Sequence, residues 1–134
     1  MDEDCIFCKI VAREIPAYIV DEDEQTLAFM DIAPATRGHA LVIPKLHTSD
    51  LWEIDEEQFA AVARAARRLA QTIKERLEPD GLNLMNSCRA QAWQTVFHLH
   101  VHVIPRYSGD PLKLPWFPAA GDMTEISAVA AQLR

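Results

Sequence analysis

Three histidines at alternate positions, His98, His100 and His102, constrain this chain more than any other feature of its sequence. Apolar side chains stand between and beside them, at Phe97, Leu99, Val101 and Val103. Because side chains alternate between the faces of a β-strand, a strand over 97–105 places the imidazoles in one row and the apolar side chains against a core. A helix would scatter the imidazoles around its axis. Such a row points to chemistry on an anion, a metal ion or both, since imidazole titrates near neutrality, attacks as a nucleophile and binds metals.

The bulk composition is that of a folded globular protein. The 134 residues are 49% hydrophobic and 25% charged, so we expect one domain over 1–134 with a full core. The net charge is −7 and no basic run exceeds Arg67-Arg68, which argues against a nucleic-acid partner. With no long apolar run and an acidic start at 1–4, we expect no membrane partner and a cytoplasmic location. Cysteines there are thiols or metal ligands rather than disulfides.

Apolar periodicity predicts the order of the elements. In chain order we expect a helix over 5–13, strands over 18–20, 25–31 and 40–43, a helix over 56–77, strands over 82–86 and 97–105, and a tail over 108–134 with a weak helical stripe at 123–133. Asp4 is the expected cap of the first helix, and Asp55 with Gln58 that of the long one. This order predicts an α+β fold in which an antiparallel sheet carries the helices on one face.

Four segments, in this order, resemble the histidine triad (HIT) superfamily. They are 5–10, 27–32, 38–47 and 98–104, and the last is similar to the family's signature of three histidines alternating with apolar residues. The resemblance covers about 4–107 and is closest to the Hint-like branch. It implies a single HIT domain with a five-stranded antiparallel sheet, one long helix, a short N-terminal helix and a homodimer joined through the sheets of two copies.

The resemblance also implies an enzyme. The family's middle histidine, here His100, is the nucleophile, and neutral imidazole can attack a phosphoryl centre. Its attacking nitrogen must be unprotonated, so we expect a backbone carbonyl near His98 to hold the other N–H. His102 is then expected beside the leaving group, donating a proton or a hydrogen bond. The implied reaction cleaves purine nucleoside 5′-monophosphates from an amine or other small leaving group, as in a nucleoside phosphoramidase, through a nucleotidyl-His100 intermediate.

Substrate contacts follow from the same resemblance. The implied phosphate ligands are Asn86, Gln94 and the backbone N–H of Thr95. Asp31 matches the family's ribose-binding acid, and a carboxylate can accept from both ribose hydroxyls. The apolar wall of the base pocket is implied at Ile6, Phe7, Ile10, Phe29 and Ile32. Plain core packing explains Ile10 and Phe29 equally well, and an apolar slot discriminates little between adenine and guanine.

Two cysteines and two histidines form a candidate zinc set. Cys5-x-x-Cys8 alone is a weak signal. The resemblance adds His47 and His98, which completes the Cys₂His₂ pattern of structural zinc. The alternative is a pair of thiols with His47 hydrogen-bonded to His98. We expect neither a redox cofactor nor a catalytic metal.

The loop over 87–93 and the tail depart from the family pattern. The resemblance therefore does not fix the chemical identity of the leaving group. Arg89 and Trp93 could lengthen or narrow that side of the site, whereas His39 is expected to brace a loop. Two other functions remain open: a dinucleoside polyphosphate hydrolase or phosphorylase, and a nucleotide-binding regulatory dimer with little turnover. Intact His100 and His102 argue against the regulatory dimer, since binding alone needs no nucleophile.

Overall fold

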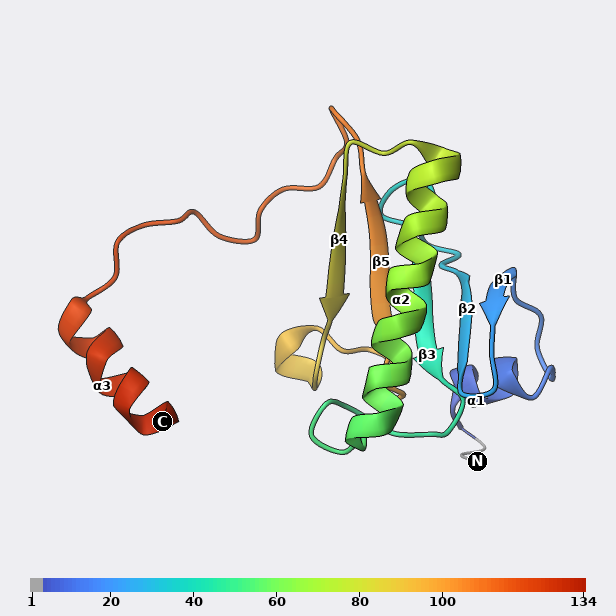
Figure 1. Cartoon of the computed structure of the whole chain (residues 1–134), viewed down its shortest axis with the longest axis horizontal. Helices are drawn as coiled ribbons and strands as arrows, with labels where there is room; N and C mark the ends of the chain where they lie inside the picture. The colour runs from blue at the N-terminus through green and yellow to red at the C-terminus, as the bar shows by residue number, and fades with distance from the viewer. Residues whose placement is uncertain (1–3) are drawn as a thin grey trace.

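A five-stranded antiparallel sheet lies at the centre of the computed structural model, which describes residues 4–134 (Figure 1). Its elements are α1 Ile6–Val11, β1 Ile19–Glu22, β2 Thr26–Met30, β3 Ala40–Pro44, α2 Glu56–Leu77, β4 Gly81–Asn86, the 3₁₀ turn η1 Ala90–Ala92, β5 Val101–Arg106 and α3 Met123–Leu133. The strand order is β1-β2-β3-β5-β4, and each neighbouring pair is antiparallel. The predicted five-stranded antiparallel α+β fold is confirmed.

The long helix α2 forms as its sequence predicts. The Asp55 carboxylate accepts a hydrogen bond from the Gln58 backbone N–H at 2.8 Å, which caps the first turn. The helix ends where Glu78 takes a left-handed conformation with φ of 51°. Its apolar stripe, which includes Val62 and Leu69, packs on one face of the sheet (Figure 1). That contact buries the face of β5 that carries Val101 and Val103.

The short helix α1 covers the opposite face of the sheet. Phe7 and Ile10 pack with Phe29 and Leu41 there, whereas the alternate residues of β2 and β3 belong to the cluster under α2. The prediction that the helices share one face is therefore wrong, because β2 and β3 are buried on both faces and need cover on each. The predicted Asp4 cap is also wrong, since the N-cap is Cys5.

The strand that carries the histidines is shorter than predicted. It begins at Val101, and the segment 97–100 bends out of the sheet before it. The Leu99 N–H donates to the Thr48 carbonyl at 2.7 Å. Phe97 is 53% exposed, so its assignment to the core is wrong. Leu99 and Val101 still belong to the core under α2.

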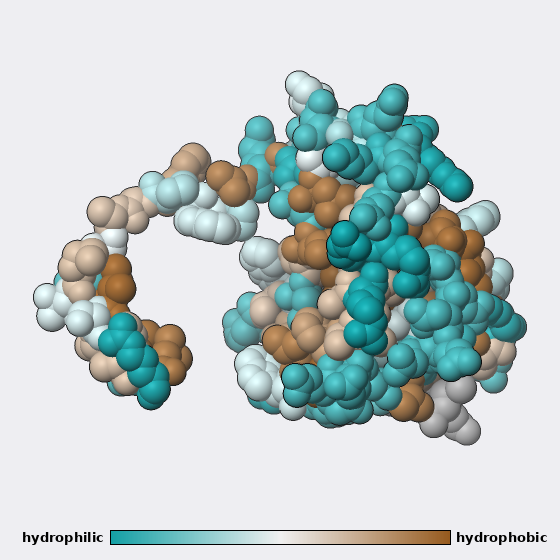
Figure 2. Space-filling model, viewed as in Figure 1, coloured by the Kyte–Doolittle hydropathy of each residue, from teal (hydrophilic) through white to brown (hydrophobic). Residues whose placement is uncertain are grey.

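The tail leaves the sheet after β5 and ends in α3. The Asp122 carboxylate caps this helix through the Thr124 N–H at 2.9 Å, and the helix covers the predicted stripe. It lies apart from the sheet, with hydrophobic surface exposed (Figures 1 and 2). Within residues 4–134, no helix has the length and apolar content needed to cross a bilayer.

Candidate functional site

The middle histidine is held in one tautomer. Its Nδ1 lies 2.8 Å from the backbone carbonyl oxygen of His98, so Nδ1 carries the hydrogen and donates it. The Nε2 atom of the neutral ring is then unprotonated, as the sequence argument requires. The ring of His100 is buried and packs edge-to-face with Phe7 at a centroid distance of 5.2 Å. That contact connects α1 to the histidine row.

Burial keeps the histidine row uncharged. It lowers the pKa of His100 below the ordinary histidine value, against the opposing effects of the bond to the His98 carbonyl and of Asp31. Burial, followed by the neighbouring His100 and His39, lowers the pKa of His102 to about 4. At neutral pH the imidazole of His102 is therefore a neutral hydrogen-bond donor and acceptor.

A chain of hydrogen bonds fixes the orientation of His102. The Ala35 N–H donates to His39 Nδ1 at 2.9 Å, so the hydrogen of neutral His39 lies on Nε2. That Nε2 is 2.9 Å from His102 Nδ1, which must accept. The remaining hydrogen of His102 is consequently on its Nε2, where it can be donated to a bound group. The Asp31 carboxylate lies 3.5 Å from the same His39 nitrogen.

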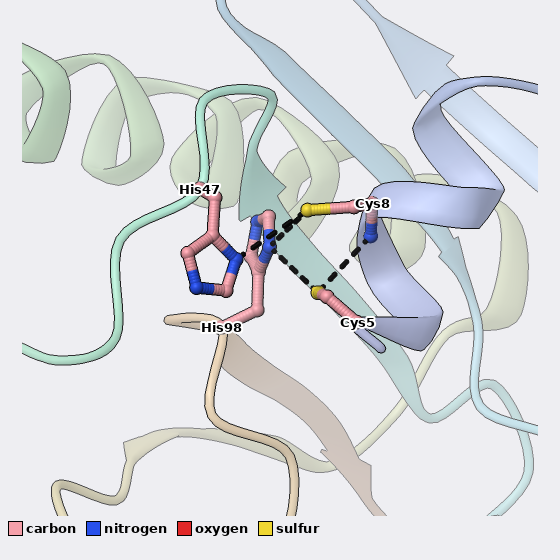
Figure 3. A group of neighbouring side chains, drawn as sticks. All are labelled: Cys5, Cys8, His47 and His98. Atoms are coloured by element: carbon pink, nitrogen blue, oxygen red, sulfur yellow. Dashed lines mark hydrogen bonds between the residues drawn. The ribbon is translucent and has the colours of Figure 1, made fainter. Parts of the chain in front are cut away.

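The first histidine has different neighbours. Nδ1 of His98 lies 3.3 Å from Cys5 Sγ and 3.5 Å from Cys8 Sγ, while His47 Nδ1 lies 3.4 Å from Cys8 Sγ (Figure 3). All four ligand atoms fall within 4.8 Å of one another. The cysteines point the same way because Cys5 caps α1, its sulfur accepting from the Cys8 N–H at 3.2 Å.

The donor chemistry of this cluster fits a tetrahedral zinc ion. Typical Zn–S and Zn–N bonds place a sulfur and a nitrogen ligand about 3.6 Å apart, close to the observed separations. His98 Nε2 is 2.7 Å from the Pro44 carbonyl oxygen and must donate to it, which leaves the lone pair of Nδ1 facing the sulfurs. Burial lowers the pKa of His98 to about 4, so the ring is neutral, as metal binding requires.

Of the predicted phosphate ligands, Gln94 and Thr95 lie in the loop before β5 and Asn86 ends β4, and the side chains of Gln94 and Asn86 are already hydrogen-bonded. The amide nitrogen of Gln94 donates to the Ser49 and Val96 carbonyls, and its oxygen accepts from the Arg89 N–H. The amide of Asn86 donates to the His100 carbonyl at 3.0 Å. Both side chains thus hold the loop and the strand in place, while Thr95 is exposed.

The predicted base-pocket residues divide into two groups. Phe7, Ile10 and Phe29 are buried in the cluster under α1, whereas Ile6 is 49% exposed and Ile32 is 86% exposed. Ile6 and Thr95 line one hollow of about 330 Å³. His39 and His102 line another hollow of about 740 Å³.

His39 accepts from the Ala35 N–H, as expected of a residue that braces a loop, but its bond to a histidine of the triad was not predicted. A signal was present, because pairing β3 with β5 sets Leu41 opposite His102. His39 lies two residues before Leu41, beside the start of β3. The carbonyl of Pro44, which receives the proton of His98, had no signal in the sequence.

The triad on this α+β sheet defines a histidine-triad protein, and comparison with known proteins agrees. A family model described as the HIT domain matches residues 12–109. The chain therefore belongs to the HIT family. It is 46% identical over 121 residues to Protein hit of Bacillus subtilis (strain 168), which covers 90% of this chain and 83% of that relative.

Solved structures share the fold. A zinc-bound histidine triad family protein from Mycobacterium smegmatis matches with a TM-score of 0.78 and 43% identity over 97% of this chain and 95% of that one. A histidine triad nucleotide-binding protein from Candida albicans matches with a TM-score of 0.86 and 30% identity, over 97% and 94% of the two chains.

Proposed function

We propose that this chain is a nucleotide hydrolase or transferase of the Hint type. It cleaves purine nucleoside 5′-monophosphates from an amine or another small leaving group through a nucleotidyl-His100 intermediate. The observation that carries the proposal is the bond from His100 Nδ1 to the His98 carbonyl, at 2.8 Å. It leaves Nε2 with a lone pair on a ring that burial keeps neutral, which is the state that a nitrogen nucleophile needs.

The reaction has two steps. His100 Nε2 forms a bond to phosphorus as the bond from phosphorus to the leaving nitrogen breaks, and that nitrogen takes a proton from water and departs as the amine. Water then attacks phosphorus and gives a proton to the hydroxide left by the first step. The P–N bond to His100 breaks with its electron pair returning to Nε2, and the nucleoside monophosphate is released. His102 assists as a hydrogen-bond donor rather than as a charged acid, because a ring with a pKa of about 4 is neutral at pH 7.

We propose contacts for the ribose, the phosphate and the base of this nucleotide substrate. Asp31 binds the ribose hydroxyls; its side chain is partly accessible, and its Oδ2 lies near His39. The backbone N–H of Thr95 binds the phosphate, while the Gln94 amide positions the loop and the Asn86 amide positions the backbone at His100. The exposed Ile6 and Ile32 contact the base more directly than the buried apolar residues do.

We further propose that a structural zinc ion binds Cys5, Cys8, His47 and His98. The separations of their ligand atoms support this assignment, as does the zinc-bound relative from M. smegmatis. The ion would join α1 to the loop after β3 and to the segment before β5. It takes no part in the chemical steps.

A homodimer and a cytoplasmic location complete the proposal. The strand β4 is an edge of the sheet in this chain and could continue the sheet into a second copy. A mass measurement in solution tests the dimer: light scattering that gives the mass of one chain at micromolar concentration would exclude it.

The decisive experiment compares two substrate classes. Purified protein is mixed with adenosine 5′-phosphoramidate and, separately, with a dinucleoside polyphosphate, and kcat/KM is measured for each. We expect the phosphoramidate to be cleaved faster. Rapid quenching into alkali should reveal a nucleotidyl mass on the peptide that contains His100.

Two results would support a different function. Faster cleavage of the polyphosphate would make the protein a dinucleoside polyphosphate hydrolase or phosphorylase. Tight AMP binding without turnover of either compound would make it a regulatory nucleotide-binding protein.

A further inference from the structure

A hollow of about 740 Å³ lies on the side of His102 away from the cysteines. It reaches from His39 and His102 to β4, the 3₁₀ turn and the start of the tail. Two tryptophans, Trp93 and Trp116, line it together with Leu114. Because His102 is one wall, whatever fills the hollow lies next to the hydrogen that His102 can donate.

Trp93 has a backbone conformation that does not suit tryptophan. Its φ is 76°, in the left-handed region that favours glycine. Packing in the core does not offset the cost of this conformation, since Trp93 is 68% exposed. Among residues 4–134, no aromatic ring or cation stacks on Trp93. A bulky residue held in such a conformation points to a role outside folding.

The neighbouring Arg89 provides a contrast within the same loop. Its φ is 74°, and its side chain has two partners: Asp50 at 3.4 Å and the ring of Trp52 at 4.9 Å. The strain at Arg89 therefore coincides with contacts that hold the loop. Trp93 also has a positive φ, and its side chain lines the hollow instead.

The charges around the hollow restrict its ligand. Arg106 and Lys113 line it, and none of the residues that line it is acidic. Arg106 is partly neutralised by Asp110 at 2.8 Å. A leaving group with its own ammonium charge has no carboxylate to pair with here, whereas a neutral or anionic group meets no repulsion.

We propose that this hollow is the leaving-group subsite, and that it takes a flat aromatic ring, neutral or anionic, against the indole of Trp93. The inference rests on the nucleotidyl-His100 reaction proposed above. The ring could belong to an aromatic amine or to the second nucleobase of a dinucleoside polyphosphate, because both present a π-face to an indole.

The test uses a pair of substrates matched in size. Adenosine 5′-phosphoramidates of 2-phenylethylamine and of 2-cyclohexylethylamine differ in the flatness of the ring. For the unmodified protein we expect kcat/KM to favour the phenyl compound about fivefold to tenfold. In Trp93→Gly we expect this ratio to fall to about one, and the thermal midpoint not to fall, because glycine relieves the left-handed strain.

The control is Phe117→Ala, which removes a tail aromatic that is 97% exposed and does not line the hollow. It should leave both kcat/KM values unchanged. A third substrate, a dinucleoside polyphosphate, identifies the source of the ring: Trp93→Gly lowers its cleavage if the subsite takes a nucleobase.

The failures of the two proposals are distinguishable. If the unmodified protein cleaves the substrates but Trp93→Gly changes neither the phenyl-to-cyclohexyl ratio nor polyphosphate cleavage, the aromatic subsite is wrong and the reaction stands. If no substrate is cleaved and no nucleotidyl-His100 forms, the reaction fails and the subsite with it.

Discussion

The two ends of the histidine row differ in chemistry although they come from one short segment. His98 is fully buried, donates to the Pro44 carbonyl and faces two cysteine sulfurs. His102 is half-buried, accepts from His39 and lines a hollow. The same side chain thus becomes a metal-ligand candidate at one end and a hydrogen-bond donor at the other. The difference comes from the segments that pack against each end, namely α1 and the loop after β3, or the loop before β3.

The sharpest test of this division is His100→Asn. The asparagine amide can still donate to the His98 carbonyl, so the fold should persist while the nucleophile is lost. We expect kcat for the phosphoramidate to fall about 10⁴-fold or more. Zinc content and thermal midpoint should stay near those of the unmodified protein. Turnover above one per cent of normal would contradict the assignment of His100.

His102→Gln should have a smaller effect. Glutamine keeps an N–H donor but loses the placement that the bond from His39 gives the imidazole. We expect kcat to fall about 100-fold, measured in single-turnover experiments, while the nucleotidyl intermediate still forms on His100. A loss as large as that of His100→Asn would contradict a role limited to hydrogen-bond donation.

The pH dependence of kcat/KM distinguishes buried imidazoles, whose pKa is lowered, from exposed ones. A free imidazole with a pKa of 6.5 would lose about tenfold of its neutral form at pH 5.5. Because burial lowers the pKa of both His100 and His102, the latter to about 4, the acid midpoint of the kcat/KM profile should lie below 6.5. A midpoint near 6.5 in the pH profile would contradict this.

The free energy of unfolding should also decrease at acid pH. The pKa of His102 is lower in the folded chain than in the unfolded one, so its contribution is complete above about pH 6.5 and is lost as the pH falls towards 4. Urea titrations at pH 7 and pH 5 should give a lower free energy of unfolding at pH 5.

Cys8→Ser should change turnover least, because it acts at the other end of the row. Removing one ligand should abolish zinc binding, measured by elemental analysis, and lower the thermal midpoint by about 10 °C. We expect kcat to stay within about fivefold, because His100 donates to the backbone carbonyl of His98 and not to the imidazole that would bind zinc. The matched control is Cys88→Ser, which lies outside the cluster. Protein that lacks zinc before mutation would remove the metal from the proposal.

Much of the fold could be predicted from local pattern. The bounds of α2 follow from Asp55 and a long apolar stripe, and they agree with the prediction. The sheet follows from short apolar runs closed by turns. The position of α1 could not be predicted in this way, because its short stripe fits either face of a sheet. Only the double-sided burial of β2 and β3 decides between the two faces.

The spacing of the three imidazoles is enough to identify the reactive groups, since residues at period two stay together wherever the strand begins. What each imidazole can do depends on its neighbours in the fold. Tautomer, charge and accessibility depend on carbonyls and side chains that lie far away in the chain, such as Pro44 and His39. Those contacts are set by how the strands pair, and spacing along one segment carries no information about them.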